Sequence, residues 1–383
     1  MSNVTHYPFN DVQGDRMINQ IKAIADDIHT ISVKVQPDFP LDSWAEFKAA
    51  IKHGYGPRIY PVGTDIQIGT DPLMTVVAHN VDKNPDNPTE FTCTILSKKR
   101  IYALQFDGRE AMYYSEDGLA AGTYWFTAKA FSSWEAGDYH FTLAQALPAG
   151  GQICIKNDAG TALTATKVQS FASRESTTAI EEVDIVSGQS GTGLGTWATA
   201  DMNHPHRISY GSNNYKESAI RQFLNSNQLS GNVWTPQTKF DRPPSWASTQ
   251  QGFMSLISED MVNAVMAVDV GCRTNTIYEA PDSTCGGTSK QYTVRDKFFL
   301  ASMQNIGFAS ESVGEQTNLW DYYVGATDAD RIKVDLGGTA GSWWLRSPYP
   351  SDAYSVRVVN TSGALGGSYA SSSSGVVPAC TIG

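Results

Sequence analysis

The sequence Trp-Trp-Leu-Arg-Ser-Pro at residues 343–348 and the sequence Gly-Val-Val-Pro-Ala-Cys-Thr-Ile-Gly at residues 375–383 frame the stretch that decides the fold of the C-terminal part. Between these flanks, residues 351–374 contain eight serines, three glycines and two tyrosines, but no Lys, Glu, Gln, Trp, Met, Phe, Ile or His. Such a composition packs no core. It is typical of binding loops, where Tyr gives rigid contact area and Ser, Gly and Asn give adaptable polar contacts. A flexible Ser/Gly linker is the alternative, and the bulky apolar flanks argue against it.

Length, composition and charge bound the class of protein. A chain of 383 residues predicts two or three domains, and 41% hydrophobic residues suffice for sizeable cores. The net charge of -11, without any Lys/Arg run, gives no electrostatic footprint for nucleic acid or an anionic membrane. No apolar run reaches the ~18 residues of a transmembrane helix, and the first residues show no signal-peptide pattern. We therefore expect no nucleic-acid partner and no membrane insertion.

The N-terminal part, residues 1–55, is predicted to be helical. Apolar residues at alternating spacings of four and three form a heptad seam, and Ile at both seam positions favours trimers. An amphipathic helix packed on its own domain is the alternative, and the spacing does not decide between the two. The seam consists of Met17, Ile21, Ile24, Ile28, Ile31 and Val35.

A second helix is predicted to begin at Ser43. Ser43 and Glu46 have the spacing of a capping box, and Gly54 is suited to the end of the helix. The apolar residues Trp44, Phe47 and Ile51 then share one face of this helix.

Residues 56–190 are predicted to form a β-rich domain of the sandwich or jelly-roll type. Tyr139, Phe141 and Leu143 alternate with less apolar residues, and turn-forming pairs such as Asp107-Gly108 separate the apolar runs. The glycine-rich stretch 188–195 is a plausible boundary. An alternative assignment gives residues 56–105 to the C-terminal domain, which makes the region after Phe106 an insertion.

Residues 191–383 are predicted to form an α+β domain with much irregular structure. Helical spacing occurs at 217–225, Ser258 is a predicted N-cap ahead of apolar residues, and 298–300 is a buried strand or the start of a helix. The remainder is rich in loops.

Candidate catalytic and metal sites are scarce. The pair His204 and His206 has no third ligand at a suitable spacing. The acidic stretch 328–335 can supply cation ligands but is equally typical of a solvated loop, and no EF-hand pattern is present. No Gly-x-Ser-x-Gly turn, phosphate-binding glycine loop or Cys/His pair is apparent. We therefore expect no catalytic residue, no metal and no cofactor.

The five cysteines are too few and too scattered for a disulfide framework. Cys272 and Cys285 could pair across a loop, but free buried thiols are favoured. The five are Cys93, Cys154, Cys272, Cys285 and Cys380.

Several motifs carry a family resemblance. The stretches 343–348 and 375–379, with supporting stretches at 214–225, 238–244 and 296–302, resemble the variable proteins of diversity-generating retroelements, in the C-type-lectin-like group of gut bacteria and their phages. The resemblance covers about residues 196–383 and implies a C-type-lectin-like fold at a virion or bacterial surface. This chain departs from the family at Val377, where relatives often have Arg. The calcium-dependent sugar-binding triplets of true C-type lectins are also absent.

The composition of residues 351–374 fits the mechanism that this resemblance implies. Such retroelements replace adenines, and an AAC or AAT codon cannot be converted in this way to a Lys, Glu, Gln, Trp or Met codon. All five residue types are missing from 351–374.

The resemblance therefore divides the C-terminal stretch into a fixed scaffold and a variable ligand-binding surface. The scaffold residues are Trp343, Trp344, Leu345, Arg346, Pro348, Val376, Val377 and Pro378. The ligand-binding residues are Tyr349, Asp352, Tyr354, Ser355, Val358, Gly366, Gly367, Ser368, Tyr369, Ser371, Ser372 and Ser374.

The expected function is thus a non-enzymatic protein that binds a protein or surface ligand. A homotrimer through residues 17–35 would add avidity to a weak site. Two alternatives remain open. One is an oxidase of the formylglycine-generating type, which shares this fold type and needs a reactive cysteine pair. The other is a structural phage or surface protein without diversification.

Overall fold

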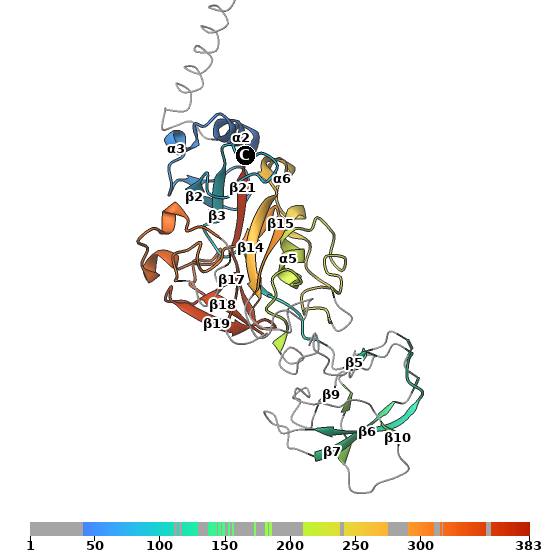
Figure 1. Cartoon of the computed structure of the whole chain (residues 1–383). Helices are drawn as coiled ribbons and strands as arrows, with labels where there is room; N and C mark the ends of the chain where they lie inside the picture. Colours follow the sequence, from blue (N-terminus) through green and yellow to red (C-terminus); the bar gives the residue numbers. More distant parts are fainter. Residues whose placement is uncertain are drawn as a thin grey trace, which may run out of the picture.

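The computed structural model shows a mixed α+β protein that consists mostly of sheets with few, short helices (Figure 1). It describes residues 41–110, 210–237, 241–274, 290–309, 315, 317–349 and 354–383, with short segments between 113 and 185. The predicted heptad segment 17–35 lies outside the described residues. In these described ranges, no helix combines the length and the apolar character that crossing a membrane requires.

One sheet joins strands from both ends of the described chain. Its order is β1-β2-β3-β21-β13, and β16 also pairs with β21. In the antiparallel pair β3–β21, Thr94 lies opposite Thr381, and their hydroxyl oxygens are 3.2 Å apart. The strands are β1 (Asp65–Ile66), β2 (Met74–His79), β3 (Cys93–Ser97), β13 (Val265–Met266), β16 (Phe298–Leu300) and β21 (Pro378–Ile382).

A second sheet carries the C-terminal stretch that frames the fold. Its order is β19-β18-β17-β20-β4, so the early strand β4 pairs with β20 near the end of the chain. Strand β20 also runs parallel to β17, with Trp343 opposite Gly375. Residues 65–105 therefore share both sheets with residues 343–382. The strands are β4 (Tyr102–Gln105), β17 (Trp343–Pro348), β18 (Ser355–Val359), β19 (Leu365–Tyr369) and β20 (Ser373–Val376).

Two helices begin at the N-caps that the sequence predicts. The Ser43 hydroxyl accepts a hydrogen bond from the backbone N–H of Glu46, and Ser258 does the same for Met261. Ser218, which the sequence did not single out, caps the helix predicted at 217–225. The helices are α2 (Trp44–Lys52), α3 (Gly56–Ile59), α5 (Ala219–Leu224) and α6 (Glu259–Ala264), with 3-10 turns η1 (Phe253–Ser255), η3 (Asp321–Tyr323) and η4 (Asp328–Arg331).

The buried carboxylate of Asp71 links α2 to α6. It accepts hydrogen bonds from the Trp44 indole N–H (2.7 Å), the Ser258 backbone N–H (2.7 Å) and the Ser258 hydroxyl (2.5 Å). Because the Ser258 hydroxyl also caps α6, one acidic side chain holds the first turns of both helices together.

A separate group of strands lies between residues 113 and 185 (Figure 1). Strands β6 and β7 form a hairpin with Gly122 opposite Leu143, at the predicted alternating run. β10 pairs with β6, β11 with β7, β5 with β8, and β9 with β12. The strands are β5 (Tyr113–Tyr114), β6 (Gly122–Ala128), β7 (Gly137–Leu143), β8 (Gln152–Ile153), β9 (Ile155–Lys156), β10 (Ala172–Ser173), β11 (Glu181–Glu182) and β12 (Asp184–Ile185).

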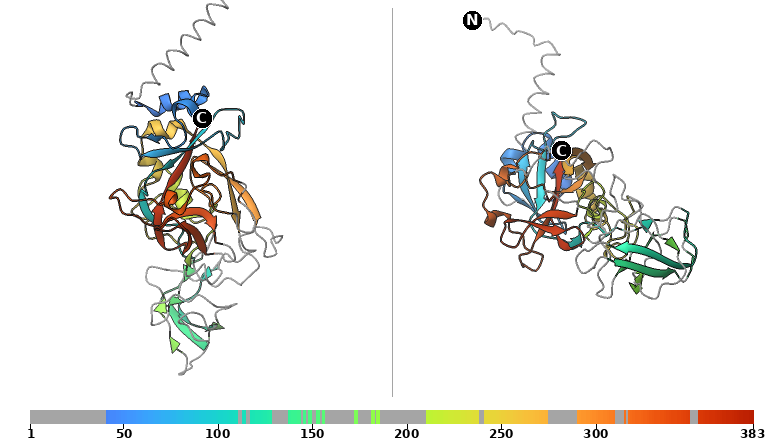
Figure 2. Two further views of the ribbon diagram at one scale, coloured as in Figure 1. Left: turned by 90° about the vertical axis from the view of Figure 1, so that its left-hand side faces the viewer. Right: turned by 60° about the horizontal axis from the view of Figure 1, so that its bottom comes forward.

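A long two-stranded ribbon completes the main body. It consists of β14 (Val268–Thr274) and β15 (Lys290–Asp296), paired antiparallel from Val268 opposite Asp296. Figures 1 and 2 agree that the C-terminus lies beside α2, whereas the β18–β19 hairpin lies at the other end of this body. The predicted contact residues on this hairpin therefore lie at one end of the main body.

Candidate functional site

The predicted scaffold residues form a buried frame beneath the C-terminal stretch. All six residues of β17 are buried, and so are Val376, Val377 and Pro378. The indole N–H of Trp343 donates to the Arg331 carbonyl (3.0 Å), and that of Trp344 donates to the Leu104 carbonyl (2.8 Å). Satisfying both buried indole groups fixes the frame against sequence-distant segments.

Arg346 is a buried cation within this frame. It is 2% exposed, and its Nε and Nη1 donate to the carbonyls of Gly271 (2.8 Å) and Leu300 (2.5 Å). Its backbone N–H donates to Ala301 (2.9 Å). Arg346 therefore ties β17 to β14 and β16. Val377, at the position where relatives often have Arg, is fully buried and apolar.

The β18–β19 hairpin carries half of the predicted contact residues. Its register places Ser355 opposite Tyr369, Arg357 opposite Gly367, and Val358 opposite Gly366. Because side chains alternate between faces along a strand, Arg357, Gly367 and Tyr369 lie on one face. Val358 lies on the other face and packs into the core.

Tyr349 packs against this outer face. Its ring lies 4.0 Å from the Arg357 guanidinium carbon, in a cation–π contact. A Cβ atom on Gly367 would approach the Tyr349 ring to 2.7 Å, so the absence of a side chain at 367 makes room for the ring. The backbone N–H of Tyr349 donates to the Ser355 carbonyl (2.8 Å), and 37% of Tyr349 remains exposed.

Three tyrosines cluster next to this pair. The ring of Tyr210 stacks on Tyr369 with a centroid distance of 4.0 Å, and it lies 5.4 Å from the ring of Tyr354. The Tyr354 and Tyr369 rings are 5.9 Å apart. Burial, reinforced by Tyr369, raises the pKa of Tyr210, so its hydroxyl stays protonated at neutral pH. We call Tyr210, Tyr349, Tyr354, Arg357 and Tyr369 the tyrosine surface.

Sequence reasoning missed two members of the tyrosine surface. Tyr210 lies well before the C-terminal stretch, and Arg357 was not among the predicted contacts. The sequence carried no clear signal for Arg357, because every residue of β18 is buried and Arg357 joins the cluster only through its contact with the Tyr349 ring. The sequence carried no signal for Tyr210, because only folding brings it next to Tyr369 and the turn after β19, where the Ser371 N–H donates to the Tyr210 carbonyl (2.7 Å).

The structure separates the predicted contact residues into two groups. Tyr349, Tyr354, Gly366, Gly367, Ser368, Tyr369, Ser371 and Ser372 are exposed or half-buried. Ser355, Val358 and Ser374 are buried, so their side chains are not part of the exposed surface. This corrects the prediction for these three, because all of β18 is buried and β20 is buried from Ser374 onward. Asp352 lies outside the described residues.

The described cysteines are packed as apolar groups. Cys93, Cys272 and Cys380 are free and buried, as the sequence predicts. Burial raises the pKa of the Cys272 thiol to about 12, and it also raises the pKa values of Cys93 and Cys380. These thiols stay protonated at neutral pH, which makes them poor nucleophiles. Cys154 and Cys285 lie outside the described residues.

The acidic stretch 328–335 uses its carboxylates within its own turns. Asp330 accepts hydrogen bonds from the backbone N–H and hydroxyl of Thr327, both at 2.7 Å, and thereby caps η4. Asp335 accepts from the Thr339 N–H (2.9 Å). Across the described part of the chain, no group of three or more His, Cys, Asp or Glu side chains is arranged to hold a metal ion. The pair His204 and His206 lies outside it.

Comparison with known proteins gives one match. A family model described as "Domain of unknown function (DUF6273)" matches residues 178–383. Strands β3 and β4 lie outside the matched range, although they pair with β21 and β20 inside it. No curated protein and no solved structure matches the chain.

Proposed function

The chain belongs to the DUF6273 family, a domain of unknown function, and we propose from the geometry of the tyrosine surface that it is a binding protein. In this proposal a C-type-lectin-like scaffold displays the tyrosine surface to a protein or surface ligand. The exposed positions around it are diversified by a retroelement, and the protein works at a virion or bacterial surface.

One observation carries the proposal: a cluster of partly exposed aromatic rings rests on a buried frame. Tyr369 is 45% exposed and Tyr349 is 37% exposed, whereas Trp343 and Trp344 in β17 of the same sheet are fully buried. Tyrosine has few rotatable bonds, so an exposed tyrosine contributes contact area at a low entropic cost. Aromatic and Arg side chains also dominate binding energy at interfaces.

The packing within the tyrosine surface favours a preorganised site. Stacking of Tyr210 on Tyr369 and of Arg357 on Tyr349 holds four side chains in defined positions before a ligand arrives. Less conformational entropy then remains to be lost on binding.

The separation of exposed from buried positions supports diversification. Changes at Tyr354, Tyr369, Ser371 and Ser372 affect side chains outside the core, so the fold tolerates them. The decisive experiment is genomic. We expect a near-copy of the DNA that encodes residues 343–383, differing only at adenines, beside a reverse-transcriptase gene. A locus without such a repeat contradicts diversification but leaves binding open.

Binding itself is tested with fluorescently labelled protein on a panel of intact bacterial cells. We expect saturable adhesion to some strains that the double substitution Tyr354→Ser and Tyr369→Ser abolishes. Tyr322→Ser is the matched control, because Tyr322 is a 39% exposed tyrosine on η3, outside the tyrosine surface. Equal adhesion of all variants would show that the tyrosine surface is not the binding site.

Trimer formation through residues 17–35 is a separate part of the proposal. Light scattering of the full chain is expected to give a trimer, and deletion of residues 1–36 is expected to give a monomer. A monomeric full chain contradicts the trimer.

A further inference from the structure

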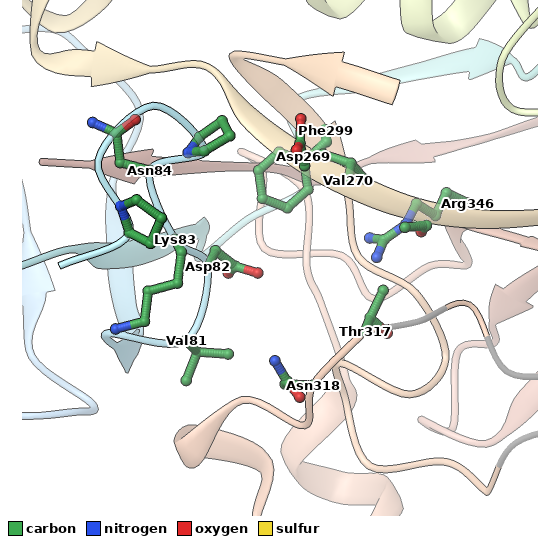
Figure 3. A pocket seen from close by; sticks show the side chains of 13 residues that line it. Val81, Asp82, Lys83, Asn84, Asp269, Val270, Phe299, Thr317, Asn318 and Arg346 are labelled. Atoms are coloured by element: carbon green, nitrogen blue, oxygen red, sulfur yellow. The ribbon is translucent and has the colours of Figure 1, made fainter. Parts of the chain in front are cut away.

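A hollow lies away from the tyrosine surface (Figure 3). It is lined by the loop after β2, by strands β14 and β16, and by Arg346 of β17. Its volume is about 190 Å³. A cavity of roughly 150 Å³ is large enough to hold a benzene molecule, so this hollow has room for a small organic ligand.

One wall of the hollow is an oriented carboxylate. Oδ2 of Asp82 accepts hydrogen bonds from the Thr94 hydroxyl (2.6 Å) and the Trp320 indole N–H (3.1 Å). Oδ1 accepts no hydrogen bond from the residues that the structure describes. One oxygen of the carboxylate is therefore held by the protein, and the Asp82 side chain lines the hollow (Figure 3).

The opposite wall carries the guanidinium of Arg346. Nε and Nη1 are held by the carbonyls of Gly271 and Leu300, and within the described chain Nη2 has no acceptor. Asp82 and Arg346 point toward each other across the hollow (Figure 3), yet no ion pair within 4.0 Å joins these two described residues. Among the described residues, two oppositely charged groups on facing walls therefore each keep an atom free for a hydrogen bond to a ligand: Oδ1 of Asp82 and Nη2 of Arg346.

Lys83 and Asp269 also line the hollow, and neutral side chains make up the rest of its lining. The Phe299 ring centroid lies 5.9 Å from the Arg346 guanidinium carbon and gives an apolar floor. Thr317 and Asn318 line the side opposite the floor (Figure 3). Burial raises the pKa of Asp82, against the opposing effects of Thr94, Arg346 and Trp320, because protein groups compensate its charge only in part.

We propose that this hollow binds a small zwitterion of the α-amino-acid class, with its ammonium group on Asp82 and its carboxylate on Arg346. The ligand donates through N–H to Oδ1 and accepts from Nη2, so each end completes a group that the protein leaves open. A ligand with a single charge completes only one of them. The inference is independent of the tyrosine surface, which shares no residue with the hollow.

Isothermal titration calorimetry with glycine, L-alanine and L-serine tests the proposal, with acetate and methylammonium as single-charge probes. At least one amino acid is expected to bind saturably, and about tenfold or more tightly than either probe, because hydrogen bonds to charged groups are the stronger class. Asp82→Asn is the matching variant. Its carbonyl oxygen can replace Oδ2 toward Thr94 and Trp320, while its N–H₂ group faces the hollow in place of Oδ1. We expect about a tenfold or greater loss of affinity.

Two controls separate loss of binding from loss of folding. Asp269→Asn changes a half-exposed carboxylate at the rim that pairs with Arg295, and it is expected to keep wild-type affinity. Val81→Phe narrows the hollow without removing a charge and is expected to abolish binding. Thermal unfolding of each variant without ligand reports whether it folds, and a ligand-dependent rise in Tm provides a second readout of binding. The proposal is overturned if no amino acid binds with a Kd of roughly 10 mM or lower, which corresponds to the weakest binding of interest. It is equally overturned if acetate matches alanine, or if folded Asp82→Asn or Val81→Phe binds as wild type does.

Discussion

The ring of Tyr210 stacks on the ring of Tyr369 with centroids 4.0 Å apart and planes 20° from parallel. Tyr210 precedes the loop that leads to α5, whereas Tyr369 ends the edge strand β19. The contact therefore fastens a sequence-distant segment to the hairpin that carries the proposed binding residues.

Tyr210→Ala and Tyr369→Ala are expected to show energetic coupling. A stacked aromatic pair contributes about 0.5–1.5 kcal/mol beyond the area it buries, so a double-mutant cycle should return a coupling of that size. Urea unfolding of wild type, both single variants and the double variant measures it. The Tyr210→Ala and Tyr322→Ala pair, without a shared contact, should give a coupling near zero. Equal coupling in both cycles would refute the role of the stack.

Gly367→Ala is expected to displace the Tyr349 ring, because the new Cβ atom would lie 2.7 Å from it. Losing the contact with Arg357 should lower the free energy of unfolding by about 0.5–1 kcal/mol or more, because Arg357 is buried and Tyr349 only partly exposed. The same substitution in a Tyr349→Ala background should have almost no effect, since no ring remains to be displaced. Chemical denaturation of the four proteins gives the comparison, and an equal loss in both backgrounds would contradict the packing.

Trp344→Ala and Tyr369→Ser are expected to differ sharply in stability. Trp344 is fully buried and donates to the Leu104 carbonyl, so its truncation should lower the free energy of unfolding by about 3–5 kcal/mol. Tyr369 is 45% exposed, so Tyr369→Ser should lower the free energy of unfolding by only about 1 kcal/mol. Denaturant midpoints measure both. Similar losses would contradict the separation of frame from variable surface.

Lys333 is expected to make stability rise with pH. Burial lowers the pKa of Lys333 from 10.5 to about 7, and Nζ donates to the Ser97 carbonyl (2.9 Å). Below about pH 7 both states hold the proton, so the cost of burying the charge is fully present. Between about pH 7 and 10.5 the folded amine is neutral while the unfolded amine is still charged, so this cost diminishes.

Lys333→Met should remove this pH dependence. The wild-type free energy of unfolding, minus that of the variant, should rise by up to about 1.4 kcal/mol per pH unit within that window. Urea unfolding at several pH values measures the difference, and Lys99→Met at a more exposed lysine is the control. Parallel curves for wild type and Lys333→Met would show that Lys333 does not titrate in this range.

The prediction from sequence worked best where neighbouring residues decide the structure. Ser43 and Ser258 were recognised as N-caps because the interaction is local: the serine hydroxyl accepts a hydrogen bond from the backbone N–H three residues later. The stretch 343–348 was expected to be scaffold because of the family resemblance and its bulky residues Trp343, Trp344 and Leu345, and all six of its residues are buried. The C-type-lectin-like arrangement and the retroelement remain predictions.

Prediction failed where buried strand residues had to be told apart from exposed ones. Ser355, Val358 and Ser374 were assigned to the contact surface from their residue types and codon logic, which carry no information about direction. Only the pairing of β18 with β17 and β19 shows that Val358 faces the core.

The sequence by itself determined the local elements: where helices start, which runs must be buried, and which stretch is built of contact-forming residues. Helix capping joins residues a few positions apart in the sequence. Hydrophobic burial is non-directional, so it needs no particular partner residue. Only the tertiary structure decided that Tyr210 joins Tyr369 and that Asp82 faces Arg346. Such partners are separated by long stretches of chain, and their meeting depends on sheet order and register, in which β3 pairs with β21 and β4 with β20.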